Sequence, residues 1–205
     1  GNTLFEIGLD VLTTTGAITQ RGVSCGFQWL DGKLGGLQPG SLIIVAAPRG
    51  GGKSALVTQM VWNVVNMGYH CAIYSREMDK RSIFQRICCI EGVDSSSWTR
   101  QRFTNGESAI ITRIASNKTT PLRVYDDLSN INDICARIRL DHIRFGTRVV
   151  IVDYIQLVRG DKKEGREREV SGVAWQLKEL ALALQITILA PSHLNKAMPA
   201  RESGD

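Results

Sequence analysis

Short apolar runs alternate along this chain with longer stretches in which apolar residues recur at helical spacing. The short runs predict strands at 42–47, 70–75, 122–126, 148–153 and 186–190. The longer stretches predict helices at 54–67, 79–91, 107–116, 131–144 and 167–184. Buried strands that alternate with amphipathic helices indicate an α/β fold, with a mostly parallel sheet covered by helices on both faces.

The first part of the chain does not follow this alternation. Residues 3–15 have the spacing of a helix, and the polar stretch that follows indicates that 1–21 is a linker segment leading into one domain over 22–205. Residues 26–40 are rich in turn-forming residues. We expect their larger apolar side chains to pack against the sheet: Phe27, Trp29 and Leu30.

Composition adds limits to this picture. The 205 residues suit one α/β domain with a full core, and the net charge of +5 permits nucleic-acid binding without indicating it. No uncharged run is long enough to span a bilayer, and no signal-peptide pattern is present. Five cysteines without C-x-x-C spacing indicate reduced thiols in a cytosol-like compartment.

The most informative segment is 42–54, LIIVAAPRGGGKS, in which an apolar strand runs into three glycines. Such a loop lets backbone N–H groups and the following helix N-terminus converge on phosphate oxygens. Lys53 is placed to reach the terminal phosphates, and the Ser54 hydroxyl to ligate Mg²⁺. Ala47 departs from the strict phosphate-loop pattern, so a glycine-rich turn in another α/β protein is the alternative. The predicted nucleotide-binding residues are Pro48, Arg49, Gly50, Gly51, Gly52, Lys53, Ser54 and Ala55.

Polar residues follow three other predicted strands. Asp153 ends a buried strand and fits a Mg²⁺ held by Ser54, although an Asp that caps a turn would look the same. Glu77 is either the base for a water that attacks the γ-phosphate or an acid that opens the next helix. His193 is either a donor to the γ-phosphate or a surface histidine.

Several motifs in this order resemble the C-terminal motor domain of replicative DnaB-type helicases, which are hexamers of the RecA-like superfamily. The matching segments are GFQWLDGKLGGLQPGSLIIVAAPRGGGKSA, YSREM, VYDDL, VVIVDYIQL and ARESG. The resemblance implies a RecA-like P-loop NTPase core that couples ATP hydrolysis to translocation on single-stranded DNA during replication. It implies ATP and Mg²⁺ as cofactors, with Lys53, Glu77 and His193 as catalytic residues and Ser54 and Asp153 at the metal. The family also tolerates alanine at the position of Ala47.

The same resemblance suggests two DNA-binding segments. The charged run 159–169 contributes Lys162, Lys163 and Arg166, although a solvated loop explains it equally well. The segment ARESG resembles a family loop that follows a single strand, and its predicted DNA-binding residues are Arg201, Glu202 and Gly204.

The implied partners are single-stranded DNA, five further copies in a homo-hexamer, a primase and a helicase loader, without a membrane. The implied location is cytoplasmic, or an organellar matrix for a mitochondrial-type relative. The family's arginine finger lies beyond the residues matched here, which predicts that the chain is a piece of a longer helicase.

Two other functions remain open from the sequence. One is a RadA- or KaiC-like recombination or regulatory ATPase, against which YSREM and VDYIQL argue. The other is a nucleotide-binding, helicase-like partner without catalysis.

Overall fold

The computed structural model describes residues 22–153 and 166–193. The strands are β1 Leu42–Ala47, β2 Cys71–Ser75, β3 Leu122–Tyr125, β4 Val149–Asp153 and β5 Thr187–His193. The helices are α2 Gln28–Leu34, α3 Lys53–Asn66, α4 Lys80–Ile90, α5 Ser95–Arg100, α6 Asn105–Ser116, α7 Ile131–Phe145 and α8 Arg166–Leu184. Each strand and helix expected after residue 40 is present close to its predicted bounds. The expected helix at 3–15 and the linker 1–21 lie outside the described residues.

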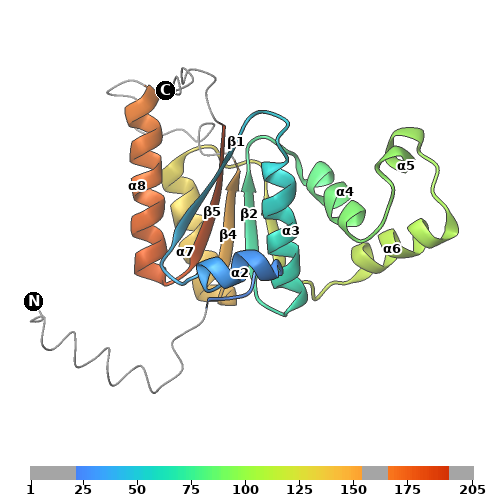
Figure 1. Cartoon of the computed structure of the whole chain (residues 1–205), viewed down its shortest axis with the longest axis horizontal. Coiled ribbons are helices and arrows are strands. Elements are labelled where there is room, and N and C mark those ends of the chain that lie inside the picture. The colour runs from blue at the N-terminus through green and yellow to red at the C-terminus, as the bar shows by residue number, and fades with distance from the viewer. Residues whose placement is uncertain (1–21, 154–165, 194–205) are drawn as a thin grey trace, which may run out of the picture.

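The strands form one parallel sheet in the order β1-β5-β4-β2-β3 (Figure 1). β1 pairs with β5, so that Ala47 lies beside His193. β2 pairs with β4, so that Ser75 lies beside Asp153. Since all strands run the same way, the loops that follow them meet at one edge of the sheet.

Helices cover both faces of the sheet, as predicted. Alternate residues of β2 face opposite sides: Tyr74 joins the core under α7 and α8, whereas Ile73 joins the core under α3 and α4. β2 and β4 are buried over their whole length, so the residues on both faces of these two strands are mostly apolar. This explains why their sequences are continuous apolar runs and not alternating ones.

One expectation for local structure is wrong, and two short helices lie where none was predicted. The stretch 26–40 contains helix α2, and Trp29 on that helix is 65% exposed instead of packed against the sheet. Phe27 and Leu30 do pack on the core, as expected. Helix α5 was not predicted, because its SSSWTR sequence is poor in helix formers; the side chain of its N-cap Asp94 accepts from the Ser96 N–H at 2.7 Å.

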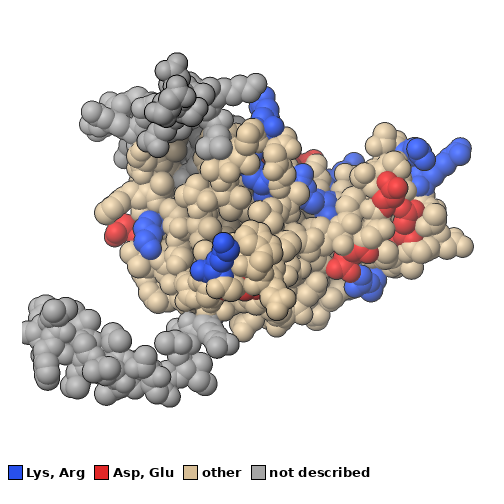
Figure 2. Space-filling model, in the orientation of Figure 1, with Lys and Arg blue, Asp and Glu red and all other residues tan. Residues whose placement is uncertain are grey.

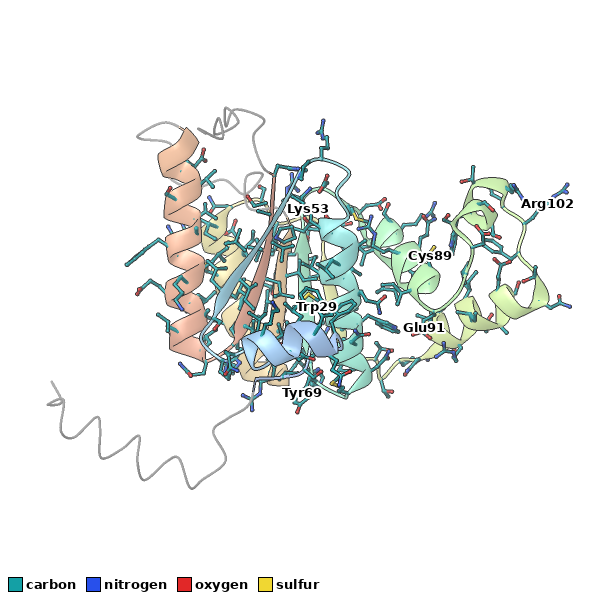
Figure 3. All side chains as sticks on the ribbon, viewed as in Figure 1. Trp29, Lys53, Tyr69, Cys89, Glu91 and Arg102 are labelled. Carbon is teal, nitrogen blue, oxygen red and sulfur yellow. The ribbon has the colours of Figure 1, made fainter. Side chains whose placement is uncertain are left out.

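Helices α4, α5 and α6 form an arm that projects from the body of the domain (Figure 1). Glu91, at the end of α4, ties this arm to α3. It accepts from the indole N–H of Trp62 on α3 at 2.6 Å and from the guanidinium of Arg113 on α6 (Figure 3). These two bonds hold the pKa of the Glu91 carboxyl below its usual value. One carboxylate therefore joins three helices.

A second buried carboxylate, Asp141 on α7, fixes α7 against two strands. Its oxygens accept from the phenol of Tyr74 on β2 at 2.9 Å and from the phenol of Tyr125 on β3 at 3.0 Å. The two rings stack with centroids 4.9 Å apart, and Asp141 is 2% exposed. The charge is buried but has two phenol donors, which is how proteins hold such groups.

Replacing Asp141 with alanine is expected to destabilise the domain by about 2–5 kcal/mol, because two phenol groups lose their acceptor in an interior that excludes water. Urea unfolding followed by circular dichroism measures the change. Asp133→Ala on the exposed side of the same helix is the control, and a loss of the same size there would contradict a special role for the network.

Candidate functional site

The glycine-rich segment forms the loop between β1 and α3, and its backbone explains the glycines. Gly50 and Gly52 each have a φ of 78°, in the left-handed region that other residues rarely adopt. A Cβ at Gly51 would lie 3.0 Å from the Pro48 carbonyl oxygen. Gly52 is also the N-cap of α3, so this helix begins where the loop ends, and its first N–H groups point toward the loop.

Lys53, the first residue of α3, lies at the edge where the strands end (Figure 3). Its side chain is buried, and Nζ lies 2.9 Å from Nδ1 of His193 on β5. Because an ammonium group only donates, the imidazole Nδ1 is the acceptor. Nε2 of the same ring lies 3.9 Å from a carboxylate oxygen of Glu77. The three predicted catalytic side chains therefore form a line across the site.

Glu77 follows β2, and the local backbone explains its position. The Ser75 hydroxyl accepts from the Met78 N–H at 2.9 Å, which turns the chain directly after the strand. Asp79 then caps α4 by accepting from the Ser82 N–H at 2.8 Å. The helix-opening acid is therefore Asp79, and this leaves Glu77 in the turn between strand and helix with its side chain 34% exposed.

Ser54 and Asp153 face each other from α3 and the end of β4. The Ser54 hydroxyl lies 3.5 Å from an Asp153 carboxylate oxygen, a long distance for a hydrogen bond. Two oxygens that share a Mg²⁺ at right angles stand roughly 3 Å apart, since each lies about 2.1 Å from the ion. A hydroxyl and a buried carboxylate at this spacing fit the protein side of such a site. Within the described ranges no three acidic, histidine or cysteine side chains are placed so that they could hold a metal ion together, so phosphate oxygens and water would complete the ligand set.

Burial, and after it the charge of the neighbouring Glu77, raise the pKa of the Asp153 carboxyl to about 6 against the opposing effects of Ser54, Lys53 and Arg86. Asp153 is 5% exposed, so loss of hydration is the main cause. Neither Lys53 nor Arg86 forms an ion pair with Asp153, so a bound cation would supply the direct opposite charge.

Nucleotide binding is therefore expected to gain from Mg²⁺ above pH 6 and to lose that gain as the pH falls through 6, because protonated Asp153 no longer attracts a cation. The gain falls about tenfold for each pH unit below the pKa. Titrating a fluorescent ADP with and without Mg²⁺ between pH 5 and pH 8 measures it.

The Asp153→Asn variant is the control for this pH effect and should show little Mg²⁺ gain at any pH.

The stability of the fold gives a second readout, which should change with pH in the opposite direction to the Mg²⁺ gain. A raised native pKa means that the native state binds the proton more tightly than the unfolded chain. The parent should therefore become more stable as the pH falls from about 6 to about 4, and this increment should be absent in the variant. A Mg²⁺ gain in the parent that does not vary with pH would contradict the assignment.

A pocket of about 250 Å³ lies over the loop, and we call it the nucleotide pocket. One side is formed by residues of the loop and of α3: Gly50, Gly52, Lys53, Ser54 and Ala55. The other side is formed by Glu77, Met78 and Arg86. Pro48, Arg49 and Gly51, which the sequence suggested as nucleotide-binding residues, do not line it.

Arg86 is a site residue that the sequence did not reveal. It lies on α4, partly buried, and its charge lowers the pKa of Asp153. Its role depends on how α4 packs beside the loop, and no spacing in the sequence shows that packing. One weak signal was available, since an arginine two turns after the Asp79 cap falls on the face of α4 that carries Ser82.

The predicted DNA-binding residues fall almost wholly outside the described ranges. Lys162 and Lys163 lie in 154–165, and Arg201, Glu202 and Gly204 lie in 194–205. Arg166 is the first residue of α8. These assignments stay predictions.

The parallel sheet with helices on both faces, and the glycine loop between its first strand and a helix, define a RecA-like P-loop core. The prediction of this fold class is confirmed. The chain belongs to the DnaB-like helicase C-terminal domain family, whose model matches residues 22–204.

Curated relatives agree with this family. The chain is 31% identical over 187 residues to the replicative DNA helicase DnaB of Geobacillus stearothermophilus, a match that covers 88% of the chain and 41% of the relative. It is 34% identical over 198 residues to the DnaB of Leifsonia xyli subsp. xyli, with 89% and 41% covered. The chain thus spans about two fifths of the length of these relatives.

Solved structures with the same fold include the ATPase domain of G40P, with a TM-score of 0.82 and 22% identity. That match covers 96% of this chain and 72% of the other. A DnaB-like replicative helicase, described with its interactions with primase, has a TM-score of 0.80 and 20% identity, with 96% and 49% covered. At these identities the likeness establishes the fold.

Proposed function

We propose that this domain is the motor of a replicative DNA helicase, which couples ATP hydrolysis to movement along single-stranded DNA. The observation that carries the proposal is the convergence of Lys53, Glu77 and His193 beside the Ser54–Asp153 pair at one sheet edge. The family and its replicative relatives support the choice of a helicase over other ATPases.

In this proposal the loop and Lys53 bind the β- and γ-phosphates. The N–H groups at the start of α3 point toward the loop, and Lys53 exchanges its contact with His193 for phosphate oxygens. Glu77 accepts a proton from the water that attacks the γ-phosphorus. His193, released by Lys53, donates to the γ-phosphate and registers its loss.

Ser54 and Asp153 would hold Mg²⁺, which neutralises phosphate charge when bound. The partly buried Arg86 borders the same pocket and adds a second positive charge opposite the loop. These residues supply the parts that phosphoryl transfer needs, namely positioning and charge stabilisation.

The proposed DNA contact rests on the segments outside the described ranges. On the face shown in Figure 2, Lys and Arg are dispersed, and over the arm they lie among Asp and Glu. That face does not offer a continuous basic stripe for a nucleic-acid backbone. The proposed partners are single-stranded DNA, further copies of the protein in a hexamer, primase and a loader. Among the described helices, none is long and apolar enough to cross a membrane.

Strand displacement tests the whole proposal. The full-length protein that contains this domain should release a labelled strand from a forked duplex only with a hydrolysable nucleotide. Nucleotide binding without displacement or DNA-stimulated hydrolysis would favour a regulatory or non-catalytic helicase-like partner instead.

Arg201→Ala in that protein is expected to weaken binding to all single strands about equally, since an interaction with the sugar-phosphate backbone is ionic and independent of sequence. The plot of log affinity against log salt should flatten by about 0.7 for each phosphate that the arginine no longer neutralises. Titration of labelled oligo-dT at several salt concentrations measures the slope. If the slope does not change, Arg201 is a solvated residue and the run 159–169 is the better candidate.

A further inference from the structure

A larger cavity, which we call the side pocket, lies beside the nucleotide pocket. Its volume is about 770 Å³, and it lies between α4 and α5. The two cavities share three wall residues: Glu77, Met78 and Arg86. Cys89 lies on the side of α4 that faces α5 (Figure 3), and it lines the side pocket but not the nucleotide pocket. A second cavity therefore lies next to the nucleotide pocket, on the other side of Glu77.

Hydrogen-bond donors line much of this cavity. They are the hydroxyls of Ser82, Ser95 and Thr99, the amide of Gln85, the guanidinium of Arg86 and the indole of Trp98. The Trp98 Nε1 atom is buried and has no acceptor within the described residues. An N–H group taken from water without a partner is costly, so this atom needs an acceptor from outside the described residues, and a ligand in the cavity would provide one.

Arg86 gives the same indication independently. It is partly buried and acts on Asp153 through its charge, yet in the described ranges it forms neither a hydrogen bond nor an ion pair. A guanidinium beside hydroxyl and indole donors matches an anion whose oxygens accept several hydrogen bonds, as phosphate oxygens do.

Two carboxylates also line the cavity and limit where an anion can sit. Asp79 is exposed at the rim and is engaged with the Ser82 N–H. Glu77 stands between the two cavities. If Glu77 accepts the proton of the attacking water, it is neutral at the moment when phosphate forms, and it then no longer repels an anion that passes it.

We propose that the side pocket receives the orthophosphate that hydrolysis produces in the nucleotide pocket, past Glu77 and along Arg86. This inference rests on the proposed function. Water attacks the γ-phosphorus, the bond from phosphorus to the β–γ bridging oxygen breaks, and ADP, orthophosphate and one proton result. While ADP still occupies the loop, the side pocket offers phosphate a path lined with donors.

Protection of Cys89 tests this on the chain itself. The protein is saturated with Mg²⁺ and ADP, so that the loop is occupied, and is then treated with iodoacetamide in millimolar orthophosphate or in chloride of equal ionic strength. Mass spectrometry reads alkylation at each cysteine. Cys135, on α7 and outside both cavities, is an internal control that is also partly accessible. Phosphate should slow alkylation of Cys89 and leave Cys135 unchanged.

Two variants tie the protection to the side pocket. Trp98→Phe removes the indole N–H and keeps a ring against Phe103, and Thr99→Val removes one hydroxyl at constant shape. Each should raise the phosphate concentration needed for half protection about tenfold, the effect of one hydrogen bond to a charged group. Thr112→Val, the same change on the exposed side of α6, should have no effect.

The remaining outcomes overturn the inference. Equal slowing at Cys89 and Cys135 would mean a general salt effect, and protection that survives Trp98→Phe and Thr99→Val would place the anion elsewhere. Protection by spermidine in place of phosphate would show that the carboxylates define the pocket. If ADP binds but phosphate protects nothing, the inference alone fails. If ADP does not bind at all, the proposed function fails first.

Discussion

Replacing Lys53 with alanine is expected to weaken nucleotide binding by about 100-fold or more. The side chain is buried at the edge where the strands end, and its ammonium group would face the β- and γ-phosphates. The variant lacks two hydrogen bonds between charged groups, each worth about 1.5–3 kcal/mol. The backbone N–H groups of the loop and the start of α3 cannot compensate, because they already take part in binding.

Equilibrium titration with a fluorescent ATP analogue measures this effect. Lys33→Ala removes an exposed lysine from α2 and controls for the change in net charge. Because Lys53 bonds to His193 and also acts on the Asp153 carboxylate through its charge, the melting temperature is measured as well, to separate a loss of binding from a loss of stability. If the Lys53→Ala protein binds the analogue as tightly as the parent, the assignment of the phosphate loop is wrong.

Glu77→Gln is expected to lower the rate of hydrolysis by about 100-fold or more while nucleotide affinity stays within a few-fold. Glutamine keeps the shape of the side chain but cannot accept the proton of the attacking water. Single-turnover hydrolysis of labelled ATP isolates the chemical step from product release. This separation matters because the phosphate proposed for the side pocket would affect release and not chemistry.

The matched control for Glu77→Gln is Glu179→Gln on the exposed face of α8. It removes the same charge far from the sheet edge and should leave hydrolysis unchanged. Retention of single-turnover hydrolysis by the Glu77→Gln protein would move the role of base to another group. Loss of affinity along with turnover would instead indicate that Glu77 organises the pocket.

The sequence predicts the central fold well because its signals are strong and local. Continuous apolar runs such as 149–152 occur where both faces of a strand are buried, and helices such as α7 carry regular apolar spacing. The signal for the proposed phosphate loop is also local, since three glycines and a lysine must be adjacent to form it. Family membership followed from these motifs and is confirmed.

What the sequence did not predict depends on packing between distant segments. Arg86 enters the site because α4 lies beside the loop, and Trp29 is exposed because α2 forms and turns it outward. The interaction between Lys53 and His193 joins two residues that the register of β1 and β5 brings together. The spacing of residues along the chain does not reveal such contacts between distant segments.

The pairing of β1, the strand before the glycine-rich loop, determines when this part of the domain can form during synthesis. β1 pairs only with β5 in the described sheet, and Leu42 is in register with Ile188. On a ribosome that adds roughly 5–20 residues per second, β1 therefore waits on the order of 10 s for its partner. During that time its apolar edge is open to other chains, and the lysine of the loop has no histidine beside it. The proposed nucleotide site is thus completed only after the other strands of the described sheet have been made, so nucleotide cannot help the nascent chain to fold at an early stage.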